Sequence, residues 1–218
     1  MLLDYIDNYK NIIKIIDKHK KVYNRDIRLI VVSKTQDYKK VVELEKLGQR
    51  DFGENYLDEA RKKIEKINNP NINWHYIGTI QSNKIKKISE NFSWIHTVAS
   101  EKHAIKINDV CKKLNKIMNV CIQINIDDED TKGGVKFDDY DDLSLIIRNM
   151  KNINLRGIMT IPKANRSCID SFAKMKDMYK KNNYLDTLSM GMSKDYVSAI
   201  EYNANMLRIG QQIFGERI

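Results

Sequence analysis

At 218 residues the chain can bury a substantial core, and its 42% hydrophobic and 31% charged residues are near the averages for globular proteins. No apolar run approaches the roughly 20 residues that cross a membrane, and the first residues lack the features of a secretory signal, so we expect a cytoplasmic protein. The net charge of +9 comes from lysines spread along helical faces rather than gathered in one tract. We therefore do not expect nucleic-acid binding as a main function.

The predicted elements alternate between helices and short strands. An amphipathic helix is expected over most of 2–22, with an apolar stripe that includes Tyr5, Tyr9 and Ile12. Short β-branched or aromatic runs predict strands at 28–33, 50–53, 73–77, 93–98, 118–126, 154–160, 187–190 and 206–209. Segments of helical periodicity lie between them, at 38–47, 56–67, 82–89, 101–114, 140–150, 168–181 and 194–202.

Eight strands with helices between them are typical of an α/β fold, the closed (β/α)₈ barrel known as the TIM barrel. Barrels of this kind need about 200 residues or more, so we expect a single domain over 1–218. Little chain follows the eighth strand, and the first helix is therefore expected to fill the eighth outer position. An open, doubly wound sheet is the alternative architecture.

In such barrels the functional site lies at the carboxyl ends of the strands. Lys34 directly follows the first strand, where partial desolvation would lower the pKa of its amine and favour attack on an aldehyde. Most lysines in this chain are expected to be solvated, and only this placement distinguishes Lys34 from them. Cys111, Cys121 and Cys168 are far apart and are expected to be reduced thiols, and no ligand spacing indicates a metal site.

The loops after strands seven and eight are where barrels often hold phosphate. Gly191 and Gly210 would let backbone N–H groups approach an anion closely, although both are also ordinary turn residues. Ser193 can cap the following helix, donate to a phosphate oxygen, or do both. Arg208, at the end of the last strand, is either a partner for an acidic neighbour or a cation that faces a ligand. We favour the interpretation in which Arg208 faces a ligand.

Five segments of the sequence carry a resemblance to a known family. They are VSKT at 32–35, FGENY at 52–56, WHYIGTIQSNK at 74–84, LSMGMSKD at 188–195 and RIGQQIFGER at 208–217. In this order and spacing they resemble the YggS/PROSC family, the pyridoxal phosphate homeostasis proteins, over nearly the whole chain. The resemblance implies a fold similar to the N-terminal barrel of alanine racemase, with pyridoxal 5′-phosphate (PLP) as cofactor.

The resemblance also implies a role for individual residues. PLP would be bound covalently, as a Schiff base, by Lys34. Phosphate contacts would fall on Ser193, Gly210 and Gln211, and the contact with the pyridine nitrogen on Arg208. The cofactor-binding residues expected at the strand ends are thus Lys34, Asn55, His75, Ser193, Arg208, Gly210 and Gln211. His96, in contrast, is expected to be a packing or surface residue.

The loop after strand five departs from the family. Members commonly show SKSG there, whereas this chain has Thr131, Lys132, Gly133 and Gly134. A secondary role in cofactor handling for the retained Lys132 is therefore left open.

The function expected is PLP homeostasis rather than rapid catalysis. A guanidinium has protons only to give, so Arg208 would keep the pyridine nitrogen unprotonated and the ring a weak electron sink. Alanine racemases take a second base from an added β domain, which we do not expect here. The chain would hold, buffer or deliver PLP, with PLP-dependent apoenzymes as acceptors. The alternatives are a PLP-dependent enzyme with weak racemase-type activity on amino acids, and a nucleic-acid-binding barrel.

Overall fold

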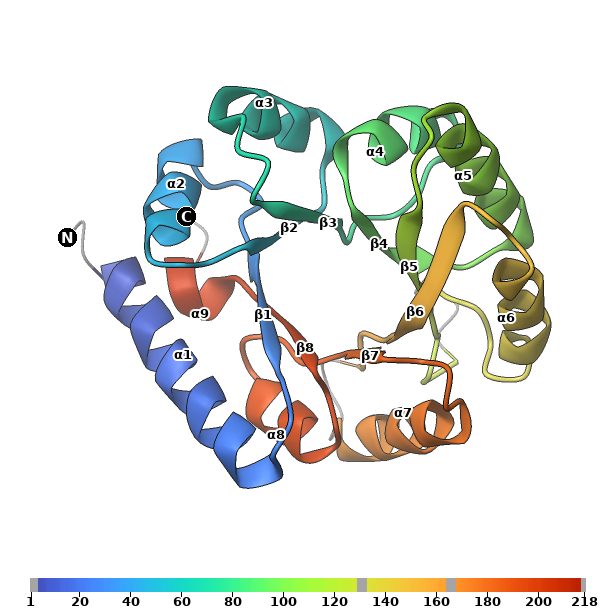
Figure 1. The fold of residues 1–218 in the computed structure, drawn as a ribbon. Coiled ribbons are helices and arrows are strands. Elements are labelled where there is room, and N and C mark those ends of the chain that lie inside the picture. Colours follow the sequence, from blue (N-terminus) through green and yellow to red (C-terminus); the bar gives the residue numbers. More distant parts are fainter. Residues whose placement is uncertain (1–3, 129–132, 164–167, 217–218) are drawn as a thin grey trace.

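The strands close into a barrel. The structure, a computed structural model, describes residues 4–128, 133–163 and 168–216. Eight parallel strands follow one another around the barrel in chain order, and the ring closes where β1 pairs with β8 (Figure 1). They are β1 (Arg28–Val32), β2 (Asp51–Glu54), β3 (Asn73–Tyr76), β4 (Trp94–Val98), β5 (Met118–Gln123), β6 (Ile153–Met159), β7 (Thr187–Ser189) and β8 (Met206–Ile209). The closed barrel is confirmed, and the open sheet is excluded.

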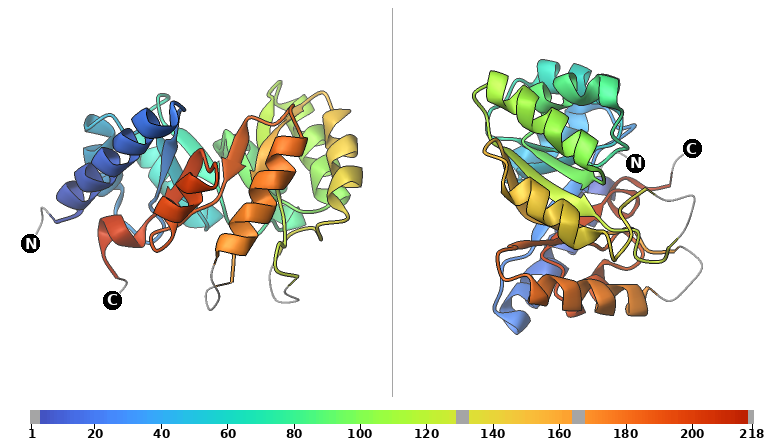
Figure 2. Two further views of the ribbon diagram at one scale, coloured as in Figure 1. Left: turned by 90° about the horizontal axis from the view of Figure 1, so that it is seen from below. Right: turned by 90° about the vertical axis from the view of Figure 1, so that its right-hand side faces the viewer.

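Helices surround the barrel on all sides (Figures 1 and 2). They are α1 (Asp4–Tyr23), α2 (Tyr38–Lys46), α3 (Leu57–Ile67), the 3₁₀ turn η1 (Ser82–Lys84), α4 (Ile85–Asn91), α5 (Glu101–Lys113), α6 (Tyr140–Arg148), α7 (Ile169–Lys181), α8 (Tyr196–Glu201) and α9 (Gln211–Phe214). Within the described ranges, no helix is both long enough and apolar enough to span a bilayer.

The first helix packs against the last elements of the chain, as expected. Helix α1 lies on the outer surface between α2 and α8 and next to α9 (Figure 1). Tyr5 lies against Phe214 with 5.9 Å between ring centroids, and Asn8 donates to the carbonyl of Ile213 at 3.2 Å. The apolar stripe of α1 is buried against the barrel wall. Both ends of the chain therefore contribute to one face of the outer layer.

Local sequence signals set several helix boundaries. Asp37 caps α2 by accepting a hydrogen bond from the backbone of Lys39, and Ser100 caps α5 in the same way. Gly48 follows α2 with a φ of +98°, a left-handed conformation that glycine adopts without strain. Asp37 and Gly48 thus mark the two ends of α2, and Ser100 marks the start of α5.

The main differences from the expected elements lie at short or irregular segments. Strand β5 ends at Gln123 rather than at 126. The next residue, Ile124, still donates to the carbonyl of Met159 at 2.8 Å but forms an isolated bridge with Val135. The segment expected as one helix over 82–89 is a 3₁₀ turn followed by α4. The four-residue helix α9, directly after β8, was not expected.

The core has two parts. A large apolar cluster fills the space between the strands and the helices, as strand residues that face outward require. A smaller cluster contains Ile30, Trp94, Cys121, Met159 and Met206, which alternate with the outward residues and therefore lie inside the barrel. The same interior also holds buried polar side chains, among them His75, His96 and Arg208.

Candidate functional site

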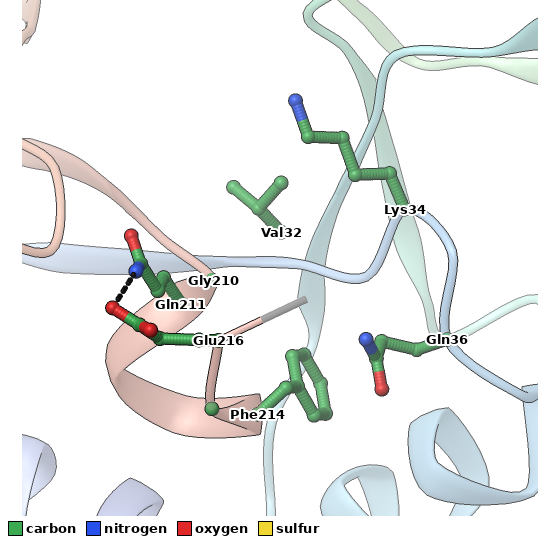
Figure 3. A pocket seen from close by; sticks show the side chains of 8 residues that line it. Val32, Lys34, Gln36, Gly210, Gln211, Phe214 and Glu216 are labelled. Carbon is green, nitrogen blue, oxygen red and sulfur yellow. Dashed lines mark hydrogen bonds between the residues drawn. The ribbon is translucent and has the colours of Figure 1, made fainter. Parts of the chain in front are cut away.

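Lys34 lies at the carboxyl end of β1 in a cavity of about 410 Å³ (Figure 3). The Lys34 cavity is lined by residues from the ends of β1 and β8, namely Val32, Lys34, Gln36, Gly210, Gln211, Phe214, Gly215 and Glu216. Gln211 donates to the Glu216 carboxylate at 3.2 Å across one side of it. Three of the residues expected at the site, Lys34, Gly210 and Gln211, are thus brought together in one cavity.

The backbone on both sides of Lys34 is held by side chains from neighbouring elements. The Ser33 hydroxyl donates to Glu54 Oε1 at 2.7 Å, and the Thr35 N–H donates to Glu59 Oε1 at 2.6 Å. Thr35 has a φ of 65°, a left-handed conformation that threonine rarely adopts. The bond to Glu59 therefore helps to fix an unfavourable turn at the residue after Lys34.

Lys63, on α3, joins these contacts into one buried cluster. Its Nζ lies 2.8 Å from Glu54 Oε1, 2.6 Å from Glu59 Oε1 and 2.6 Å from the carbonyl oxygen of Ser33. Burial raises the pKa of Glu54, and the Lys63 ammonium opposes that shift. Nothing in the sequence distinguished Lys63 from the solvated lysines around it, because the contact spans two strands and a helix.

Arg208 lies inside the barrel, two residues before Gly210 on the same inward-facing side. Its side chain is buried, with Nη1 donating to Ser189 Oγ at 2.6 Å and Nη2 to the carbonyl of Thr160 at 2.8 Å. Burial lowers the pKa of Arg208 to about 10, against the opposing effect of Asp195, so the guanidinium stays charged at neutral pH. Within the described ranges it forms no ion pair.

The loops after β7 and β8 are tied together by Ser193. Its hydroxyl oxygen accepts a hydrogen bond from the backbone N–H of Gln212 at 3.1 Å. The backbone N–H groups of Ser193 and Gln211 donate to no other residue in the described part of the chain. Each loop therefore has a backbone N–H group that can donate a hydrogen bond to an anion.

Both loop glycines are required by close contacts. A Cβ at Gly210 would lie 2.9 Å from the carbonyl oxygen of Val32, and one at Gly191 would lie 2.7 Å from the Ala199 Cβ. Gly191 also has a φ of +93°. The end of β8 can approach β1 this closely only because no side chain is present.

Asn55 follows β2 and carries a buried amide oxygen that accepts no hydrogen bond from any described residue. Its backbone carbonyl is covered by Gly78, where a Cβ would lie 2.0 Å from the oxygen. A buried amide group without a partner is costly, so Asn55 is suited to a ligand at this edge of the barrel.

His75, which was expected to line a strand end, is the third of the four residues of β3. It is completely buried within β3, with Nε2 2.9 Å from Asp51 Oδ1 and Nδ1 3.0 Å from His96 Nε2. Both ring nitrogens are therefore occupied by protein groups, which leaves His75 nothing to offer a cofactor directly. His96, expected to be a packing or surface residue, is a buried residue, and its ring links His75 to Ser189.

Two further expectations concern metals and the loop after β5. Across the described ranges, no three His, Cys, Asp or Glu side chains gather as a metal would require. Lys132 lies outside the described residues, and its role stays a prediction.

Comparison with known proteins agrees with the family expected from the sequence. The alanine racemase N-terminal domain model matches residues 7–218. A pyridoxal phosphate homeostasis protein from Buchnera aphidicola subsp. Schizaphis graminum is 40% identical over 206 residues, which cover 89% of this chain and 88% of that protein. The chain belongs to the pyridoxal phosphate homeostasis protein family. The Escherichia coli K12 member is 37% identical over 205 residues, covering 88% of this chain and 86% of its own.

Solved structures extend the comparison to three dimensions. PipY of Synechococcus elongatus, a structure with PLP bound, has a TM-score of 0.80 at 30% identity and covers 87% of this chain and 92% of its own. An alanine racemase from Clostridium difficile has a TM-score of 0.77 at 17% identity, over 98% of this chain and 57% of the racemase. The racemase is a likeness of fold alone, and it agrees with the barrel described above.

Proposed function

We propose that this chain binds PLP at the mouth of the barrel, with Lys34 as the covalent attachment site, and holds the cofactor for buffering or delivery. Bound PLP supplies an aldehyde that a primary amine can capture reversibly and a ring that can accept electrons. The observation that carries the proposal is the Lys34 cavity, which is lined both by Lys34 from the β1 end and by Gly210 and Gln211 from the β8 end (Figure 3). Family membership and the PLP in PipY support it.

The donor groups around the cavity fit a phosphorylated ligand. The backbone N–H groups of Ser193 and Gln211 have capacity left for the phosphate. The unpaired amide oxygen of Asn55 is an acceptor, so it suits a donor group of the ligand rather than its phosphate. The absence of a side chain at Gly210 lets the end of β8 lie close to Val32, so that Gln211 and Lys34 line the same cavity. In the proposed arrangement Ser193, Gly210 and Gln211 hold the phosphate, and Lys34 holds the aldehyde carbon as a Schiff base.

Arg208 is the residue that favours a carrier over an enzyme. Because it stays protonated, it can only donate to the pyridine nitrogen, and a ring whose nitrogen is kept unprotonated is a weak electron sink. Apart from Lys34, the ionisable group among the eight residues that line the cavity is the exposed Glu216 carboxylate. No second amine, phenol, thiol or imidazole is among these residues, which supports binding and release rather than proton abstraction on two faces.

The first test is the visible absorption spectrum of the protein reconstituted with PLP, followed by borohydride reduction and peptide mapping. Wild type and Lys39→Ala, the loss of an exposed lysine on α2, are expected to show the band and to carry the reduced adduct at Lys34. Lys34→Ala is expected to lack both. A wild-type protein that cannot be reconstituted, or an adduct that maps to other lysines, would refute the covalent site.

A second experiment separates a carrier from an enzyme. The loaded protein is mixed with an apo-aminotransferase, and recovery of aminotransferase activity reports delivery of PLP. In parallel, amino acids are incubated in deuterium oxide with the loaded protein. Delivery without exchange of the α hydrogen supports the carrier, whereas sustained exchange would establish the racemase-type alternative.

A further inference from the structure

A continuous line of hydrogen bonds crosses the interior of the barrel and ends on Arg208. It starts at Asp51, the first residue of β2, whose Oδ1 lies 2.9 Å from His75 Nε2. His75 Nδ1 lies 3.0 Å from His96 Nε2, and His96 Nδ1 lies 3.0 Å from Ser189 Oγ. Ser189 Oγ in turn accepts from Arg208 Nη1 at 2.6 Å. Five side chains from five strands thus form one chain, which we call the interior chain.

The two ends of the interior chain dictate where its protons lie. An ionised Asp51 can only accept, so His75 donates from Nε2 and, when neutral, accepts at Nδ1. His96 must then donate from Nε2 and accept at Nδ1 from the Ser189 hydroxyl. The Ser189 oxygen is left to accept from Arg208, which can only donate. Every bond therefore points the same way, from Arg208 to Asp51.

Burial favours this arrangement with both imidazoles neutral. His75 and His96 are fully buried, and burial is the largest cause that lowers both of their pKa values. For His96 the charges of His75, Arg208 and Arg28 lower the pKa further. Burial raises the pKa of Asp51, but its hydrogen bond with His75 and the nearby charges outweigh that effect, so the net shift is downward and favours the carboxylate.

The common direction of these hydrogen bonds stabilises the buried charge of Arg208. It is a buried cation that no carboxylate contacts within the described ranges, and an isolated buried charge is very costly. Each side chain between Arg208 and Asp51 directs its accepting lone pair toward Arg208. The carboxylate of Asp51, which can only accept, sets this direction for all the hydrogen bonds of the interior chain. With Nη1 held by Ser189 and Nη2 by the carbonyl of Thr160, the plane of the guanidinium has one orientation.

We infer that Asp51, His75, His96 and Ser189 are positioning residues that hold Arg208 in the orientation that serves the cofactor ring. The inference rests on the proposed function, because it assigns the contact with the pyridine nitrogen to Arg208. His75 thereby acquires a role through Arg208 instead of the direct contact expected from the sequence.

The interior chain itself is tested without cofactor, by nitrogen NMR of the histidine side chains in wild type and in Asp51→Asn. The matched control is Asp186→Asn, which removes a carboxylate that pairs with Arg156 and takes no part in the chain. Wild type is expected to show two neutral imidazoles protonated at Nε2. Asp51→Asn is expected to shift the resonances of His96 as well as those of His75. Asp186→Asn is expected to leave the resonances of both histidines unchanged. A change confined to His75 would overturn the inference.

The effect on Arg208 is read from PLP labelled with ¹⁵N at the pyridine nitrogen and bound to each protein. We expect the nitrogen to be unprotonated in wild type and in the control. Asp51→Asn and Ser189→Ala are expected to raise its apparent pKa by about one unit, a tenfold change in proton affinity. Bound PLP whose nitrogen titrates identically in all four proteins would overturn the positioning role.

The two experiments fail in different ways. Should Asp51→Asn not fold, Ser189→Ala breaks the chain at its other end and is judged by the same two readouts. If the wild type binds no PLP, the proposed function and the role of Arg208 fail together. Absence of the Nε2 pattern in a protein that binds PLP would overturn the interior chain and leave the proposed function standing.

Discussion

Replacing Lys63 by methionine is expected to destabilise the protein strongly. The Lys63 ammonium contacts the carboxylates of Glu54 and Glu59 and the carbonyl of Ser33, and the exposed fractions of the Lys63 and Glu54 side chains are 7% and 0%. Removing one partner of such a buried pair leaves an uncompensated charge and costs about 3–5 kcal/mol. For a protein of this size that corresponds to a fall in Tm of about 6–20 °C.

The defect should also depend on pH. Without Lys63, Glu54 loses the charge that opposes the rise of its pKa, so its carboxyl must stay protonated in the folded protein to a higher pH. A folded pKa above the unfolded one means that stability is lost as the pH rises between the two values. The loss should therefore be larger at pH 7 than at pH 5, by at most about 1.4 kcal/mol for each pH unit in that window.

Urea unfolding followed by circular dichroism measures both effects. Lys62→Met, a change at the exposed neighbouring position, is the control. Adding Glu54→Gln to Lys63→Met should recover part of the loss, because the unpaired charge is then gone. A loss of less than about 1 kcal/mol for Lys63→Met, or no recovery in the double variant, would refute the reasoning.

Three further predictions concern Gly210, His96 and the cysteines. In Gly210→Ala the new methyl meets the carbonyl of Val32, so we expect at least about tenfold weaker PLP binding in a spectroscopic titration, and unchanged binding would contradict the close approach. The pKa of His96 is depressed in the folded state, so stability should fall as pH drops below about 6.5, and the slope should be smaller in His96→Gln, as urea unfolding can show. Burial raises the pKa of the Cys121 thiol to about 12, so an aromatic disulfide reagent should modify the half-buried Cys168 first and Cys121 only on unfolding.

The fold was predictable because its signals are local. Most strands are short runs rich in β-branched or aromatic residues, and the longer helices repeat their apolar residues with the helical period, so the count of eight was already visible in the sequence. The segment at 82–89 and the helix α9 were misjudged because a single turn is too short to show a period. Beyond Gln123 the chain bridges to Val135 across a loop, a contact between distant residues that the local pattern of 118–126 does not contain.

The site was predictable only where a residue follows a strand directly. Lys34, Gly210 and Gln211 follow β1 and β8, and the structure brings them into one cavity. The complete burial of His75 and its two protein partners could not be predicted, because a sequence motif does not tell in which layer of the barrel a side chain lies. His96 was undervalued for a related reason, since its partners come from β3 and β7 and share no sequence pattern with it.

The pairing of β1 with β8 has a consequence for how the protein and its ligand depend on each other. Arg208 sits beside Ile30 in that pairing, while Lys34 and Gly210 continue the same two strands beyond its end. A molecule attached to Lys34 and bound next to Gly210 would therefore connect β1 and β8, the first and last strands of the barrel. Such a molecule would hold β1 and β8 together, so its binding would stabilise the pairing of these two strands more than the rest of the barrel. The exchange of the amide hydrogens of β1 and β8 should then slow more than that of any other strand when the ligand is bound.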